Sequence, residues 1–249
     1  MDTLTFGERL VAAGREYGRL CVGIDPHAAL LEQWGLPDSV EGLRVFSQIC
    51  VDAFAGHVAV VKPQVAFYER FGAAGFAVLE STLAALREAG TLVIADAKRG
   101  DIGSTMAGYA AAWLAPGAPL EADALTLTPY LGVGSLAPAI DMAGEHHKGV
   151  FIMAANSNPE AVALQTGKID GRMLSQRMVD ECATYNSVGR VGHVGVVVGA
   201  TVSTPPVLDS LNGPVLMPGV GAQGGGSNAG ICSAEPMYTQ TKPPASRVG

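Results

Sequence analysis

Short apolar runs recur along the chain, at intervals long enough to hold a helix. The runs are rich in Val, Ile and Leu and nearly continuous in apolar character, which is typical of parallel strands covered on both faces. They predict strands over Leu20–Ile24, Val58–Lys62, Leu92–Asp96, Ala124–Leu127, Gly149–Met153, Val194–Val198 and Val215–Met217. Helical patterns between them predict helices over Ser39–Phe54, Gly75–Ala89, Ser104–Leu114, Leu136–Gly144 and Gly171–Asn186.

The alternation of strands and helices runs along the chain without a charge break or a linker, and it predicts a parallel sheet. Seven predicted strands in a chain of 249 residues favour an α/β fold of the closed (β/α)8 TIM barrel type, with parallel strands inside and helices outside. We expect residues 1–249 to form one such domain. An open doubly wound sheet is the alternative, but it usually begins with a GxGxxG turn, whereas Asp25-Pro26-His27 follows the first strand here.

The C-terminal segment 224–249 is atypical. It is rich in Gly, Pro and Ser, and its pattern shows neither the eighth strand nor the closing helix of a complete barrel. Two interpretations remain open for this segment. It is either a loose loop with a short strand, or a sequence altered or truncated relative to a complete barrel.

Composition and charge narrow the class of protein. A hydrophobic fraction of 48% and a charged fraction of 16% are typical of a compact soluble enzyme. The net charge of −7 and the lack of any Lys/Arg block argue against a nucleic-acid partner.

No apolar run approaches the ~18 residues of a membrane span, and the first residues, MDTLTFGERL, do not form a signal peptide. The cysteines, Cys21, Cys50, Cys182 and Cys232, form no CxxC pair and fit reduced thiols in the cytoplasm.

Charged side chains stand where the apolar runs end. Asp25 ends the first run, Lys62 ends the second, and Asp96 and Lys98 end the third. Side chains on a strand alternate between its two faces, so Asp96 and Lys98 are expected on the same side. An ammonium and a carboxylate at the end of a buried strand are costly unless they act together. Because the carboxyl ends of barrel strands meet at one face, we predict an active site there.

Two later loops reach the same predicted face. Asn156-Ser157-Asn158 follows the fifth strand. The glycine-rich loop Gly219–Gly226 follows the seventh strand, and its closely spaced backbone N–H groups suit a phosphate. Barrel enzymes frequently bind phosphate with the loops after strands seven and eight, which strengthens this interpretation.

A family resemblance rests on these residues. The segment Asp96-Ala-Lys98-Arg-Gly-Asp101-Ile-Gly-Ser-Thr105 resembles the DxKxxDIxxT signature of the orotidine 5′-phosphate decarboxylase family. Over roughly residues 5–225, further motifs resemble the longer bacterial branch of that family: Gly23-Ile-Asp25-Pro, Val61-Lys62-Pro-Gln-Val-Ala-Phe67, Thr128-Pro-Tyr-Leu-Gly132, Ser157-Asn-Pro159 and Pro218-Gly-Val-Gly-Ala-Gln-Gly224.

The resemblance implies a cytoplasmic homodimeric barrel with active sites at the subunit interface. It implies decarboxylation of orotidine 5′-monophosphate to UMP and CO2, without a metal or an organic cofactor. Lys62, Asp96, Lys98 and Asp101 would form a charged catalytic network, with Asp101, Ile102 and Thr105 contributed to the partner's site.

The resemblance also implies how the substrate is bound. Asp25 would bind the ribose hydroxyls, and Ser157 would hydrogen-bond the pyrimidine. Gln223 and the backbone of the loop at Pro218, Gly219, Gly221 and Gly224 would hold the phosphate. The family also clamps the phosphate with an arginine near the end of the barrel, for which Arg247 is the only late candidate.

Two other functions are kept as alternatives. One is a Mg²⁺-dependent decarboxylase or aldolase of the same barrel group, acting on a keto-sugar phosphate, although such enzymes lack the Lys62 motif. The other is a relative that binds the nucleotide but has weakened catalysis because of its altered C-terminus.

Overall fold

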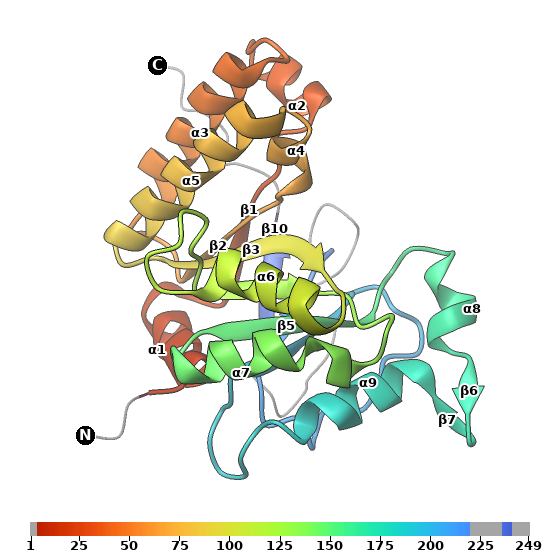
Figure 1. The fold of residues 1–249 in the computed structure, drawn as a ribbon. Helices are drawn as coiled ribbons and strands as arrows, with labels where there is room; N and C mark the ends of the chain where they lie inside the picture. The colour runs from red at the N-terminus through yellow and green to blue at the C-terminus, as the bar shows by residue number, and fades with distance from the viewer. Residues whose placement is uncertain (1–3, 220–235, 241–249) are drawn as a thin grey trace.

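A closed barrel of eight parallel strands forms the centre of the molecule (Figure 1). The structure, a computed structural model, describes residues 4–219 and 236–240. Around the barrel the strands follow the order β1-β10-β9-β8-β5-β4-β3-β2. The barrel strands are β1 (Leu20–Ile24), β2 (Val60–Pro63), β3 (Leu92–Arg99), β4 (Ala124–Leu127), β5 (Gly149–Ala155), β8 (Val194–Val198), β9 (Val215–Met217) and β10 (Pro236–Gln240). The TIM barrel predicted from the sequence is therefore confirmed.

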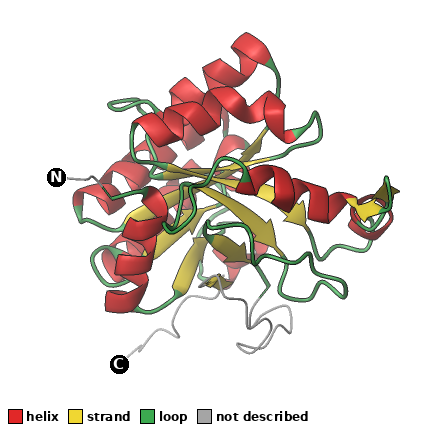
Figure 2. Ribbon diagram, turned by 90° about the horizontal axis from the view of Figure 1, so that it is seen from below, coloured by secondary structure: helices red, strands yellow, loops and turns green. Residues whose placement is uncertain are grey.

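Helices lie outside these strands (Figure 2). They are α1 (Phe6–Tyr17), α2 (Ala28–Gln33), α3 (Val40–Phe54), α4 (Ala66–Glu69), α5 (Gly72–Glu88), α6 (Gly103–Leu114), the 3-10 helix η1 (Val133–Leu136), α7 (Ala137–Glu145), α8 (Ala161–Gln165) and α9 (Leu174–Ala183). A short antiparallel hairpin of β6 (Lys168–Ile169) and β7 (Arg172–Met173) projects beside α8 in Figure 1. Among the described residues, no helix is long and apolar enough to cross a membrane.

The sequence pattern does not reveal the eighth barrel strand, β10, which the structure contains. β10 pairs with β1 on one side and β9 on the other, and so closes the barrel. Its sequence, Pro-Met-Tyr-Thr-Gln, contains a proline and few β-branched residues, so its conformation depends on these non-local pairings rather than on local propensity. β10 is the short strand that one of the two interpretations of the C-terminal segment allows, and the rest of that segment lies outside the described residues. Residues 241–249, in which the sequence pattern shows no closing helix, lie outside the described residues.

One predicted helix differs from the structure, and one connection departs from the regular alternation of a (β/α)8 barrel. The helix expected over Gly171–Asn186 is shorter, because Asp170 and Gly171 have φ angles of 52° and 78° and form the turn of the β6–β7 hairpin. In the connection between β8 and β9, residues 199–214 are all described and contain no helix. Leu208 and Leu211 from this connection are buried in the core, where the side chains of a helix would otherwise pack.

Two apolar clusters hold the fold together. One packs the outer faces of the strands against the helices. The other fills the barrel, and its members come from alternate strand positions and from α1: Phe6, Leu10, Cys21, Ala59, Val60, Leu92, Ile94, Ala124, Phe151, Val197 and Leu216. Such layers of inward-pointing side chains make a barrel interior a packed core rather than a pore.

Helix α1 closes the N-terminal end of the barrel with Phe6. The ring of Phe6 is fully buried and meets the ring of Phe151 edge-on, with centroids 6.0 Å apart. Gly149 makes this possible, because a Cβ atom at that position would lie 2.2 Å from Cδ1 of Phe6.

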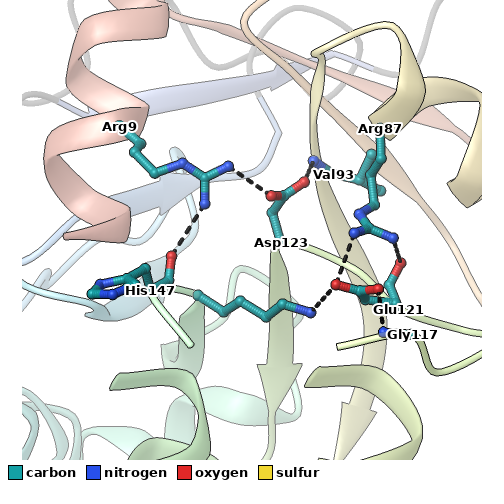
Figure 3. A network of polar contacts seen from close by, with 8 residues as sticks. Arg9, Arg87, Val93, Gly117, Glu121, Asp123 and His147 are labelled. Atoms are coloured by element: carbon teal, nitrogen blue, oxygen red, sulfur yellow. Dashed lines mark hydrogen bonds and ion pairs between the residues drawn. The ribbon is translucent and has the colours of Figure 1, made fainter. Parts of the chain in front are cut away.

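An acidic residue at the start of β4 ties three elements together at the same end (Figure 3). The Asp123 carboxylate accepts hydrogen bonds from the Val93 N–H (3.0 Å) and from the Arg9 guanidinium of α1 (2.8 Å). Arg9 also donates to the His147 carbonyl at 3.1 Å. These contacts fix α1 against the first residues of β3, β4 and β5.

Next to Asp123, the Glu121 carboxylate forms ion pairs with Lys148 and Arg87. Its Oε1 lies 2.7 Å from both Lys148 Nζ and Arg87 Nη2, and its Oε2 accepts from the Gly117 N–H at 2.8 Å. Burial opposes ionisation, but the Lys148 ammonium and the Gly117 N–H outweigh it and lower the pKa of the Glu121 carboxyl. Charged groups at this end of a barrel serve stability rather than catalysis.

The described cysteines are buried thiols. Cys21, Cys50 and Cys182 are free, and burial raises the pKa of each thiol to about 12. They are therefore protonated and unreactive at neutral pH. Cys232 lies outside the described residues.

The packing of α1 predicts that Phe6→Ala destabilises the barrel. Removing the ring leaves a cavity beside Phe151, and the free energy of unfolding should fall by about 3–5 kcal/mol. The measurement is chemical denaturation followed by circular dichroism. The control Val188→Ala, at a highly exposed position, should change stability by less than about 0.5 kcal/mol. Equal stability of Phe6→Ala and the unmodified chain would show that α1 does not close the barrel.

Candidate active site

A buried carboxylate lies between two ammonium groups at the C-terminal ends of β2 and β3. Asp96 Oδ2 accepts a hydrogen bond from Lys62 Nζ at 2.7 Å, and Asp96 Oδ1 accepts one from Lys98 Nζ, also at 2.7 Å. Lys62 is 6% exposed and Asp96 is 9% exposed, whereas Lys98 reaches further into solvent. The expectation that Asp96 and Lys98 point to the same side is therefore confirmed.

The pairing keeps both buried groups charged. Burial opposes ionisation of Asp96, but Lys62 and Lys98 outweigh it and lower the pKa of the carboxyl to about 2. Burial likewise opposes the charge on Lys62, but Asp96 and Asp25 raise its pKa above the usual range. At neutral pH the Asp96 carboxylate and the Lys62 ammonium thus form a charged pair, in an environment of low polarity where their fields are strong.

Two further residues complete the shell of Asp96. The Thr126 hydroxyl of β4 donates to Asp96 Oδ1 at 2.9 Å. With the nitrogen of its amide facing Asp96, Gln64 donates to Oδ2 at 2.6 Å and accepts from Lys98 Nζ at 3.1 Å. Sequence reasoning missed both. The position of Gln64, two residues after Lys62 at the end of a strand, was a usable signal, because that spacing places both side chains on one face.

Lys98 has an unusual backbone conformation. Its φ angle is 49°, a left-handed value that costs a non-glycine residue about 1–3 kcal/mol. The register between β3 and β4 shifts between Ala95 and Arg99 at this point. Gly100 follows, and a Cβ atom there would lie 2.3 Å from the Thr128 carbonyl oxygen. The strand end is therefore locally irregular where the exposed ammonium is presented.

Other predicted residues lie at the same end of the barrel. Asp25 follows β1 and is half-buried, and burial raises the pKa of its carboxyl although Lys62 opposes the shift. Ser157 follows β5, is exposed, and packs closely against Gly199. Pro218 and Gly219 follow β9, and the Pro218 carbonyl accepts from Ala200 N–H at 2.9 Å.

The structure does not join Asp101 to the network within one chain. Its Oδ1 accepts from the N–H of the next residue, Ile102, at 2.8 Å. Ile102 is 60% exposed, and Thr105 is exposed on the first turn of α6. The contacts described for Asp101 and Ile102 thus join these residues to each other and not to the pairing of Lys62 and Asp96. The predicted phosphate residues Gly221, Gln223, Gly224 and Arg247 lie outside the described residues.

A cavity of about 410 Å³ opens beside Lys98. Its lining includes Thr128, Met153, Asn156 and Arg177, a mixture of apolar and hydrogen-bonding groups that suits a small organic ligand. A second cavity of the same volume lies at the opposite end of the barrel, around Arg15 and Leu208, far from the charged network. The cavity beside Lys98 adjoins the charged network through Lys98 alone, because Lys62 and Asp96 are not part of its lining.

The described part of the chain holds no group of three His, Cys, Asp or Glu side chains arranged to bind a metal ion. What it does hold is an ammonium group, fixed by a carboxylate, beside a cavity. Such an arrangement can stabilise negative charge that develops on a bound molecule, and can then donate a proton to it.

Comparisons with known proteins show which family the chain resembles. Residues 18–238 match the profile of the orotidine 5′-phosphate decarboxylase / HUMPS family. The chain is 61% identical over 228 residues to an orotidine 5′-phosphate decarboxylase of Corynebacterium efficiens, covering 90% of this chain and 81% of the relative.

Solved structures show the same likeness. A Streptomyces avermitilis crystal structure, named provisionally as an orotidine 5′-phosphate decarboxylase, superposes with a TM-score of 0.92 at 48% identity, over 97% of this chain and 87% of that one. The OMP decarboxylase of Leishmania donovani superposes with a TM-score of 0.75 at 28% identity, over 96% of this chain and 90% of that one. The chain therefore belongs to the orotidine 5′-phosphate decarboxylase / HUMPS family.

Proposed function

We propose that Lys62, Asp96 and Lys98 are the catalytic groups with which this chain converts orotidine 5′-monophosphate to UMP and CO2. The reaction itself, a step of pyrimidine biosynthesis, follows from the family and from the relatives at about 60% identity. The roles of individual residues are supported by one observation above all: the Asp96 carboxylate lies 2.7 Å from each of two ammonium groups.

Lys98 provides the charge and the proton that the reaction needs. When the bond from C6 to the carboxylate carbon breaks, CO2 leaves and the electron pair stays on C6, where the pyrimidine has no electron sink. An ammonium fixed beside C6 stabilises that carbanion electrostatically. Lys98 Nζ then donates a proton to C6, which yields UMP and a neutral amine that regains its proton from water.

Asp96 and Lys62 prepare the site for this step. Asp96 holds Lys98 in place and lies near the carboxylate of the substrate, so their repulsion is relieved as CO2 leaves. Lys62 compensates the Asp96 charge from the buried side, and the carboxylate therefore stays ionised. The three groups act as one unit because each depends on the charge of its neighbour.

The remaining predicted residues bind the parts of the substrate that do not react. Asp25 takes the ribose hydroxyls and Ser157 the pyrimidine. The loop beginning at Pro218 and Gly219 takes the phosphate, with Gly221, Gln223, Gly224 and Arg247 beyond the described residues. Binding energy from the remote phosphate can then be used to stabilise the transition state.

A homodimer with shared sites fits the position of Asp101. Its carboxylate accepts a hydrogen bond from the N–H of the adjacent Ile102 and none from Lys98. The carboxylate can therefore act in the site of a partner subunit. Ile102 and Tyr130 are 60% and 80% exposed, an apolar surface close to the mouth of the barrel. Asp101, Ile102 and Thr105 would then complete the site of the partner subunit.

We also propose a cytoplasmic location for the enzyme. The buried free thiols of Cys21, Cys50 and Cys182 fit a reducing compartment.

The proposed role of Lys98 predicts that Lys98→Ala abolishes turnover and leaves the fold intact. The loss of ultraviolet absorbance of orotidine 5′-monophosphate measures turnover, and circular dichroism with thermal unfolding checks the fold. Lys168→Ala, at an exposed lysine of the hairpin, is the matched control and should keep the rate of the unmodified chain. A near-normal rate for Lys98→Ala would remove Lys98 from the mechanism.

Shared active sites predict complementation between two inactive variants. In a heterodimer of Lys98→Ala and Asp101→Ala subunits, one of the two sites contains both native residues. Random association should then restore about a quarter of the normal activity. The measurement is the decarboxylation rate of the two co-expressed variants, compared with each variant alone.

The control for complementation is the pair Lys98→Ala and Asp96→Ala. Both residues lie in the same subunit's share of the site, so every heterodimer has two defective sites and stays inactive. If the pair containing Asp101→Ala also stays inactive while its heterodimer is isolated intact, the shared site is rejected.

A further inference from the structure

The hydroxyl of Thr126 joins the backbone of Lys98 to the carboxylate of Asp96. Thr126 Oγ1 accepts a hydrogen bond from the Lys98 N–H at 2.9 Å and donates one to Asp96 Oδ1 at 2.9 Å. A hydroxyl has a single proton and two lone pairs, so both bonds can form at once. Thr126 is 1% exposed and belongs to β4, so its position is set by the barrel.

The strand pairing explains why a side chain makes this contact. The register of β3 against β4 shifts between Ala95 and Arg99, so the backbone ladder is interrupted at Lys98. Two threonines at the end of β4 hydrogen-bond the backbone of Lys98 instead. The Thr126 hydroxyl accepts from the Lys98 N–H, and the Thr128 hydroxyl donates to the Lys98 carbonyl oxygen at 3.2 Å. The two hydroxyls bracket the one residue of β3 whose φ angle, 49°, is left-handed.

We propose that Thr126 is a positioning residue, whose hydroxyl sets the distance between the Lys98 ammonium and the reacting carbon by holding the Lys98 peptide and the Asp96 carboxylate together. This inference rests on the roles proposed above for Lys98 and Asp96. Asp96 Oδ1 receives both the Thr126 hydroxyl and the Lys98 ammonium. One oxygen atom therefore connects the end of the Lys98 side chain to the residue that holds its backbone.

The Thr126 hydroxyl makes two hydrogen bonds that an apolar side chain of the same shape cannot make. Valine has nearly the shape of threonine but neither donates nor accepts. In Thr126→Val, the Lys98 N–H loses its acceptor and Asp96 Oδ1 loses its hydroxyl donor, while the packing of β4 is kept. Serine keeps the hydroxyl and loses only a methyl group. The pair of variants thus separates hydrogen bonding from packing.

The test compares Thr126→Val, Thr126→Ala and Thr126→Ser in the full chain, with orotidine 5′-monophosphate as substrate. The variants without a hydroxyl should lower kcat about 10- to 100-fold, the effect of one hydrogen bond to a charged group. Their KM, and the Kd for UMP measured by calorimetry, should change less than about threefold, because Thr126 does not touch the bound nucleotide in this account. Thr126→Ser should recover most of the kcat.

The control is Thr82→Val, which removes the hydroxyl of another buried threonine, on α5, that donates to the Val78 carbonyl. It should leave kcat unchanged. The inference is overturned if kcat of Thr126→Val stays within about twofold of the unmodified chain, a difference smaller than one hydrogen bond would make. It is overturned equally if Thr126→Ser is as slow as Thr126→Val, or if both hydroxyl-free variants unfold by circular dichroism, since the role is then structural.

Lys98→Ala, assayed alongside, separates two kinds of failure. If Lys98→Ala is inactive while Thr126→Val is normal, only the role of Thr126 fails. If Lys98→Ala is itself active, the proposed mechanism fails and the inference fails with it.

Discussion

The site depends on one electrostatic constraint, which is that the buried carboxylate of Asp96 must be compensated from two sides. Removing the buried ammonium of Lys62 would leave an uncompensated charge in the barrel, at a cost of about 3–5 kcal/mol. Lys62 compensates the charge from the interior side, and Lys98 does so at the mouth. Because Lys98 is held by Asp96, the charge presented to the cavity is positioned before any ligand binds, which is the condition for electrostatic catalysis.

The barrel supplies the rigidity that this constraint requires. Residues packed inside the strands, with Phe6 of α1 beneath them, fix β2, β3 and β4 relative to one another. Polar contacts of Asp123 and Glu121 hold the opposite end of these strands. At the mouth, the fold departs from regular geometry at Lys98, where φ is 49°. Within β3, only Lys98 has this left-handed backbone, and local strain of this kind is common at functional sites.

Much of this arrangement could be predicted from the sequence. The apolar runs predicted seven of the barrel strands, and the charges at their ends placed Lys62, Asp96 and Lys98 at one face before any contact was known. These features are local, because they depend on strand periodicity and on short motifs. The role suggested for Asp101 could not be derived in this way, since its carboxylate accepts from the neighbouring Ile102 N–H and the role depends on a second subunit.

The missed features are non-local. β10 has a poor strand pattern and exists through its pairing with β1 and β9. The contact of Thr126 with Lys98 depends on a register shift between β3 and β4, which no periodicity in either strand reveals. The hairpin that shortened the predicted α9 follows from the left-handed backbone of Asp170, a conformation that its residue type permits but does not require.

The most direct measurement is the ultraviolet absorbance of orotidine 5′-monophosphate mixed with the purified chain in the presence of EDTA. The account predicts a loss of signal that matches the formation of UMP, because the proposed steps use only the side chains of the protein. Absence of turnover, or turnover that appears only when Mg²⁺ is restored, would contradict the claim that the pairing of Lys62, Asp96 and Lys98 carries the chemistry.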